Sequence, residues 1–120
     1  MDVHIIIANM KVHSYLEVSL MSKIPNEEMI DMMENTLHIA SDSTRLKIMI
    51  CLEGEEKSVS EIVKEVGASQ SLVSHQLQVL RNANLVSYRK VGTSVFYSLD
   101  DEHVSQLISV VREHVEEKLK

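Results

Sequence analysis

Apolar residues recur along most of this 120-residue chain at the three- and four-residue spacing of amphipathic helices. The pattern predicts five helices, over residues 25–40, 41–52, 58–66, 69–81 and 99–119. Capping residues stand at their starts, and glycine follows two of them. Between the last two helices the period changes to that of strands. Residues 85–91 and 94–99 are rich in β-branched and aromatic residues and flank Gly92-Thr93, which predicts a β-hairpin.

The helices over 58–66 and 69–81 are separated only by a short turn that contains Gly67. Two helices joined in this way, followed by a hairpin, have the layout of a winged helix-turn-helix. The fold class is therefore mainly α with a β-hairpin wing. Its small core favours a homodimer, formed through the N- and C-terminal helices.

The helix over 69–81 has two different faces. Val73, Leu77 and Leu80 form an apolar stripe. The other face starts at the N-cap Ser69 and bears short polar side chains, namely Gln70, Ser71, Ser74 and His75. Such a face suits a recognition helix that enters the DNA major groove by its N-terminal end. An ordinary solvated helix would show the same pattern, but the neighbouring helix and hairpin favour DNA binding. Arg89 and Lys90, near the hairpin tip, are then expected to hold phosphates.

A net charge of −6 is unfavourable for DNA binding, because phosphate contacts need Lys and Arg. The charge is unevenly distributed, however. Residues 57–98 have five Lys or Arg and two Asp or Glu, whereas residues 1–56 have four and ten, and residues 99–120 have three and six. The predicted DNA-binding segment is thus the positive one. Its excess is modest, so we expect a dimer that contacts two half-sites with strong salt dependence.

Several function classes find no support. No run of 18 apolar residues and no signal peptide is present, so we expect a cytoplasmic protein with no membrane partner. The single cysteine, Cys51, excludes an internal disulfide and is interpreted as a core thiol. No nucleotide-binding glycine loop or nucleophile motif occurs, so we expect no enzyme. Residues 1–24 are interpreted as an N-terminal arm and residues 25–120 as the domain; Met21 is an alternative start.

The last helix combines an apolar seam with polar residues beside it. The seam consists of Val104, Leu107, Ile108, Val111, Val115 and Leu119. His103, His114 and Glu117 fall beside it within a sector of about 60°. His103 and His114 are about 16 Å apart along one helix, too far to bind one ion together. If two copies of the helix pack antiparallel across a two-fold axis, Asp101 and His103 of one subunit meet His114 and Glu117 of the other.

Two imidazoles and two carboxylates are nitrogen and oxygen donors without a thiolate. This set suits Zn(II) first and Co(II) next, rather than Cu(I), Cd(II), Pb(II) or arsenite. The alternative is that these residues are ordinary solvated surface.

Four segments of the chain resemble the ArsR/SmtB family of metal-sensing winged-helix repressors. They are residues 43–48, 69–77, 85–90 and 95–104. In the zinc-sensing branch of that family, the terminal-helix site has Asp-x-His, then His and a fourth ligand three residues later, which Asp101, His103, His114 and Glu117 match. The resemblance implies antiparallel pairing of the terminal helices. It also implies an apo dimer that represses at an inverted-repeat operator and is released by metal.

The resemblance has further implications. It suggests that His114 donates a hydrogen bond to the backbone carbonyl near Asn84, just after the recognition helix. The family's thiol site is expected to be absent, because residues 57–61 contain no cysteine. His4 and His13 could supply ligands for a Ni(II) or Co(II) sensor that uses the arm. Two other functions stay open: a winged-helix regulator that does not sense metal, and a protein-interaction module.

Overall fold

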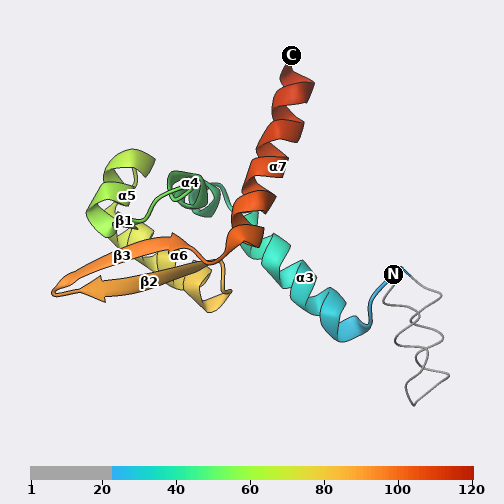
Figure 1. Ribbon diagram of the computed structural model, residues 1–120, viewed down its shortest axis with the longest axis horizontal. Helices are drawn as coiled ribbons and strands as arrows, with labels where there is room; N and C mark the ends of the chain where they lie inside the picture. The colour runs from blue at the N-terminus through green and yellow to red at the C-terminus, as the bar shows by residue number, and fades with distance from the viewer. Residues whose placement is uncertain (1–22) are drawn as a thin grey trace. The chain divides into compact units, whose positions relative to one another are not determined.

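The computed structural model describes residues 23–120, so His4, His13 and Met21 lie outside the described residues. The predictions for the arm therefore stay predictions. In chain order the elements are α3 (Glu27–Ala40), α4 (Ser43–Cys51), β1 (Lys57–Ser58), α5 (Val59–Val66), α6 (Gln70–Asn82), β2 (Val86–Val91), β3 (Ser94–Leu99) and α7 (Glu102–Leu119) (Figure 1). All five helices and the hairpin were predicted from the sequence. Strand β1 was not, because two residues show no period.

Helix α3 is capped by Asn26, whose side-chain oxygen accepts a hydrogen bond from the Met29 N–H at 2.9 Å. None of its residues is buried, and Met29, Met32 and Met33 are 48–64% exposed. The chain divides into two units between residues 35 and 36, inside this helix. The hydrophobic core lies in the second unit, residues 36–120.

The core consists of twelve buried residues from α4 to α7 and the wing: Ile48, Met49, Cys51, Leu52, Ile62, Val73, Leu77, Leu80, Leu85, Val86, Val104 and Ile108. Asp42 caps α4 by accepting a hydrogen bond from the Arg45 N–H at 3.0 Å. Ile50 of the same helix is 37% exposed and lies outside this core. At 100° per residue it points about 150° away from the inward direction shared by Ile48, Met49 and Leu52.

The sheet has the order β1-β3-β2 and is antiparallel throughout. In the hairpin, Tyr88 lies opposite Tyr97 and Arg89 lies opposite Phe96. Because successive side chains of a strand point to opposite faces, these two pairs lie on different faces of the wing. Gly92, at φ 62°, supplies the left-handed backbone that the tight turn requires.

Helix α7 starts at the N-cap Asp101, whose side chain accepts a hydrogen bond from the Val104 N–H at 3.1 Å. Val104 and Ile108 are buried in the core. Farther along, the helix extends beyond the body formed by α4–α6 and the wing (Figure 1), and the seam residues Val111, Val115 and Leu119 are exposed. Among the described residues, no helix is long and apolar enough to cross a membrane.

Candidate functional site

The helix-turn-helix is held by local capping chemistry. Ser58 caps α5 in a reciprocal box with Glu61, in which each side chain accepts from the other residue's backbone N–H. Gly67 ends α5 in the left-handed conformation, at φ 76°. After a three-residue turn, the Ser69 side chain accepts from the Leu72 N–H at 3.2 Å and starts α6. The predicted capping role of Ser69 is confirmed.

Helix α6 buries its apolar stripe, Val73, Leu77 and Leu80, as predicted. The residues predicted to read DNA, Gln70, Ser71, Ser74 and His75, are all exposed. Arg45 of α4 connects α6 to the end of α3. Its guanidinium donates a hydrogen bond to the Gln76 side-chain oxygen at 2.8 Å and another to the Ile39 carbonyl at 2.6 Å. A rigid helix therefore presents a polar N-terminal face to solvent.

Leu72 lies beside that face and is 40% exposed. It was not among the residues predicted to read DNA. An exposed apolar side chain in the first turn of a recognition helix can contact a thymine methyl group.

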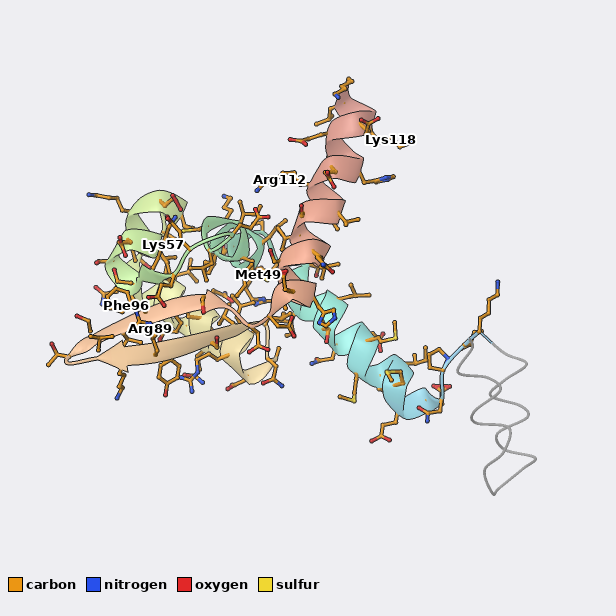
Figure 2. All side chains as sticks on the ribbon, in the orientation of Figure 1. Met49, Lys57, Arg89, Phe96, Arg112 and Lys118 are labelled. Carbon is orange, nitrogen blue, oxygen red and sulfur yellow. The ribbon has the colours of Figure 1, made fainter. Side chains whose placement is uncertain are left out.

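The two predicted phosphate-binding residues of the wing have different surroundings. Lys90 is exposed. Arg89 forms a bidentate ion pair with Glu56, which precedes β1, and its guanidinium also lies 5.5 Å from the Phe96 ring centre (Figure 2). Hydrogen bonding from Arg89 lowers the pKa of Glu56, so the carboxylate stays charged. Sequence reasoning missed this partner, which lies 33 residues away.

The predicted metal ligands fall into two groups on α7. Asp101 and His103 lie together at its start, with 3.5 Å between a carboxylate oxygen and Nδ1. Hydrogen bonds from the Val104 N–H, and then from His103, lower the pKa of Asp101. His114 and Glu117 are exposed farther along the helix, and Glu117 lies 3.7 Å from Lys120. Within the described residues of one protomer, no three His, Cys, Asp or Glu side chains are close enough to hold a metal.

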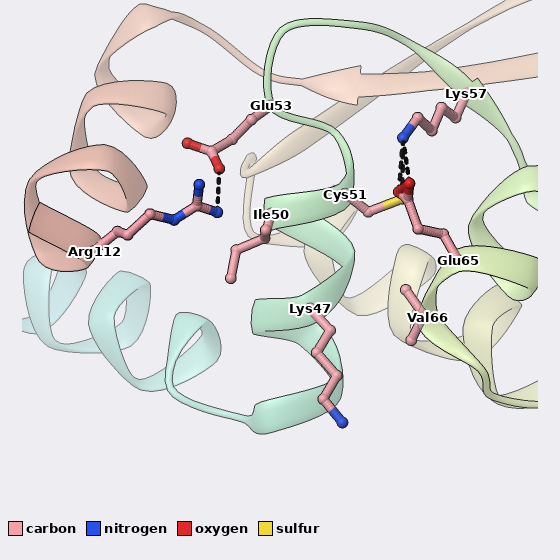
Figure 3. A pocket seen from close by; sticks show the side chains of 8 residues that line it. All are labelled: Lys47, Ile50, Cys51, Glu53, Lys57, Glu65, Val66 and Arg112. Carbon is pink, nitrogen blue, oxygen red and sulfur yellow. Dashed lines mark hydrogen bonds and ion pairs between the residues drawn. The ribbon is translucent and has the colours of Figure 1, made fainter. Parts of the chain in front are cut away.

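A cavity of about 590 Å³ is lined by residues of α4, β1, α5 and α7 and of the loop before β1 (Figure 3). The Arg112–Glu53 ion pair, at 2.7 Å, stands at one side. At the other, Lys57 pairs with Glu65 at 2.7 Å and lies 3.7 Å from the Cys51 sulfur. Arg112 and Lys57 are thus each paired with a carboxylate, and Lys47 adds a third cation to the lining.

Comparison with known proteins gives a consistent result. A family model described as "Bacterial regulatory protein, arsR family" matches residues 42–88. The chain is 43% identical over 77 residues to the "Transcriptional repressor SmtB homolog" of Synechocystis sp., covering 64% of this chain and 58% of that protein, so it spans less than two thirds of that relative. It is 40% identical over 82 residues to the "HTH-type transcriptional regulator NmtR" of Mycobacterium tuberculosis, covering 68% of each.

Among solved structures, the homodimeric winged helix-turn-helix DNA-binding domain of Mb0332 from Mycobacterium bovis superposes with a TM-score of 0.73 and 26% identity. The match covers 82% of this chain and 94% of that domain. The predicted winged helix-turn-helix fold is thus confirmed. These relatives are named as transcriptional regulators or DNA-binding domains, and not as enzymes, as the sequence predicted. The chain belongs to the ArsR family of bacterial regulatory proteins.

Proposed function

We propose that this protein is a metal-responsive transcriptional repressor: the apo dimer binds operator DNA, and Zn(II) or Co(II) causes its release. Residues 25–120 form the DNA-binding and dimerisation domain, preceded by an arm over residues 1–24. The observation that supports this most directly is that an ArsR-family chain pairs Asp101 with His103 at 3.5 Å at the start of α7 and exposes His114 and Glu117 farther along it.

For DNA binding, each protomer contributes the exposed N-terminal face of α6. Ser69, Gln70, Ser71, Ser74 and His75 form this face. In a two-fold dimer the two helices enter successive major grooves, about 34 Å apart. Lys90 and Arg89 of the wing contact phosphate, and Arg89 does so by exchanging the Glu56 carboxylate for a DNA phosphate.

The residues of α7 fit a zinc ion by their chemistry. Asp101 and His103 of one protomer, with His114 and Glu117 of the partner subunit, supply two imidazoles and two carboxylates. A divalent ion held by these residues would join the terminal helices of both protomers, which would favour a dimer geometry that is poor for DNA. The hydrogen bond from the Val104 N–H lowers the pKa of Asp101, so its carboxylate keeps its charge to lower pH than an ordinary aspartate. By linkage, DNA must weaken metal binding by the same factor as metal weakens DNA binding.

We expect His114→Gln to fold, dimerise and bind DNA in its apo form but to lose metal-driven release, because one ligand of each intersubunit site is missing. The operator would be recovered by selection from randomised duplexes. Zinc stoichiometry would be measured by competition with a chromophoric chelator, and DNA release by fluorescence anisotropy. His38→Gln, an exposed histidine on α3, is the matched control and should bind one tight zinc per protomer like the wild type.

A normal zinc response in His114→Gln would overturn the site. No tight zinc in the wild type would leave a winged-helix regulator with a different signal. Cobalt and nickel would then be tested with the arm intact and removed, because His4 and His13 lie there. No DNA binding at low salt would instead favour a protein-interaction module.

A further inference from the structure

Arg81, at the end of the recognition helix α6, continues the side of the helix that is proposed to face DNA. At 100° per residue it points within about 20° of both Gln70 and Ser74. It lies seven residues after Ser74, which is about 10.5 Å along the axis. The major groove is about 12 Å wide. When the first turn of α6 contacts base edges in the groove, Arg81 therefore lies near the sugar-phosphate backbone that borders the groove.

The wing holds the Arg81 side chain in place. Its guanidinium carbon lies 4.2 Å from the ring centre of Tyr88 on β2, and Tyr88 in turn packs against Tyr97, with 6.0 Å between ring centres. Stacking of a guanidinium on an aromatic ring is favourable and restricts the long side chain. Arg81 is thus fixed between the recognition helix and the wing before DNA arrives.

Arg81 differs from the other arginines of the described chain in its hydrogen bonding. Arg45 donates to Gln76 and to a backbone carbonyl, Arg89 pairs with Glu56, and Arg112 pairs with Glu53. Over residues 23–120, Arg81 has a ring beneath it but no hydrogen-bond acceptor. A guanidinium has five N–H donors in a planar fork that matches phosphate oxygens. Its donors are available to an external anion.

The same face of the wing carries a second cation. Lys90 follows Tyr88 by two residues on β2, so both point to one face, while Arg89 points to the other with Phe96 and Glu56. A line of side chains therefore runs from the end of α6 towards the wing tip. We call it the Arg81 strip, and it consists of Arg81, Tyr88 and Lys90.

We infer that Arg81 binds a DNA phosphate and that Tyr88 positions it. The Arg81 strip then contacts the DNA backbone between the major groove that α6 enters and the tip of the wing. The inference rests on the proposed DNA binding and extends it to a residue outside the predicted reading face. Because phosphate contacts are independent of sequence, it can be tested without knowing the operator.

The experiment measures the salt dependence of binding to a mixed-sequence duplex of about 30 base pairs, long enough for two half-sites. We expect Arg81→Gln to weaken binding and to reduce the slope of log K against log salt by about 0.9 per protomer, the effect of one lost phosphate contact. Tyr88→Phe keeps the ring and should resemble the wild type. Tyr88→Leu removes the ring and should weaken DNA binding. In the double variant with Arg81→Gln, it should weaken binding little beyond the effect of Arg81→Gln alone.

Arg112→Gln is the control, because it makes the same charge change on α7, away from the wing (Figure 2). Thermal melts would establish that each variant is folded. If the wild type binds the duplex but Arg81→Gln has the slope of Arg112→Gln, the inference is wrong while the proposed function stands. If the wild type binds no duplex at low salt, the proposed DNA binding itself fails. Equal weakening by Tyr88→Phe and Tyr88→Leu would overturn the positioning role of the ring.

Discussion

At the scale of single residues, the surroundings of Cys51 determine its chemistry. The side chain is 8% exposed in the core, where the sequence placed it as a structural thiol. Burial and the hydrogen bond to the Glu65 carboxylate raise the pKa of the thiol to about 11, and together they outweigh the nearby Lys57 ammonium, which lowers it. Cys51 is therefore a protonated, unreactive thiol at neutral pH.

This predicts slow alkylation of Cys51 by iodoacetamide in the native protein, because only the thiolate reacts. At pH 8 about one thiol in a thousand is ionised when the pKa is about 11. The rate, followed by mass spectrometry, should rise about tenfold per pH unit between pH 8 and 10. The denatured protein is the control and should react far faster at pH 8. Comparable rates in the two states would contradict the raised pKa.

The raised pKa also has a consequence for stability. A folded thiol that holds its proton more tightly than the unfolded thiol stabilises the protein below the unfolded pKa. This contribution is present below about pH 9 and is lost as pH rises towards 11. Alkaline pH should therefore weaken the fold through Cys51.

At the scale of elements, local sequence signals predicted the helix boundaries but not the pairing of segments that are distant in the chain. Ser58, Gly67 and Ser69 define helix ends through hydrogen bonds or backbone angles within a few residues, so the boundaries of α5 and α6 could be read from the sequence. Strand β1 exists only because it pairs with β3, about 40 residues later. The Glu56–Arg89 ion pair likewise joins distant segments, and no local pattern reveals it.

In the proposed mode of DNA binding, the Glu56 carboxylate competes with DNA phosphate for Arg89. We expect Glu56→Gln to tighten binding to a mixed-sequence duplex, because Arg89 no longer exchanges a carboxylate for a phosphate. The salt slope should change little, because Arg89 contacts one phosphate in both proteins. Salt titrations by fluorescence anisotropy would measure both the affinity and the slope.

Glu55→Gln is the matched control. It makes the same charge change at the neighbouring residue, whose carboxylate lies near Lys57 instead, at 3.4 Å. If Glu55→Gln and Glu56→Gln tighten binding equally, the effect is one of net charge, and the ion pair does not restrain Arg89.

At the scale of the whole molecule, the seam of α7 shows what periodicity can and cannot reveal. The sequence predicted one continuous apolar stripe from Val104 to Leu119. The structure divides it: Val104 and Ile108 belong to the protomer's own core, while Val111, Val115 and Leu119 are exposed. Both parts repeat with the same period, so only the position of the other elements separates them. The candidate metal residues are divided similarly, since Asp101 and His103 meet within one protomer and His114 and Glu117 do not join them.

The exposed part of the seam is the surface that the proposed dimer would bury. A substitution there should therefore prevent dimerisation but leave the protomer folded. We expect Val115→Glu to keep the protomer fold, because Val115 is 46% exposed and lies outside the core. A charge in an apolar contact between two α7 helices should shift the protein towards monomer, measured by analytical ultracentrifugation over a range of concentrations. Ser109→Glu adds the same charge at an exposed position about 120° around α7 from Val115, so it should remain dimeric.

The same variant links assembly to function. If the zinc site takes Asp101 and His103 from one protomer and His114 and Glu117 from the other, Val115→Glu should lose tight zinc although all four ligands are intact. Its affinity for DNA should also fall, because a monomer contacts one half-site. A monomeric Val115→Glu that retains one tight zinc per protomer would show that the ligands lie within a single chain, and the antiparallel pairing of the α7 helices would then have to be abandoned.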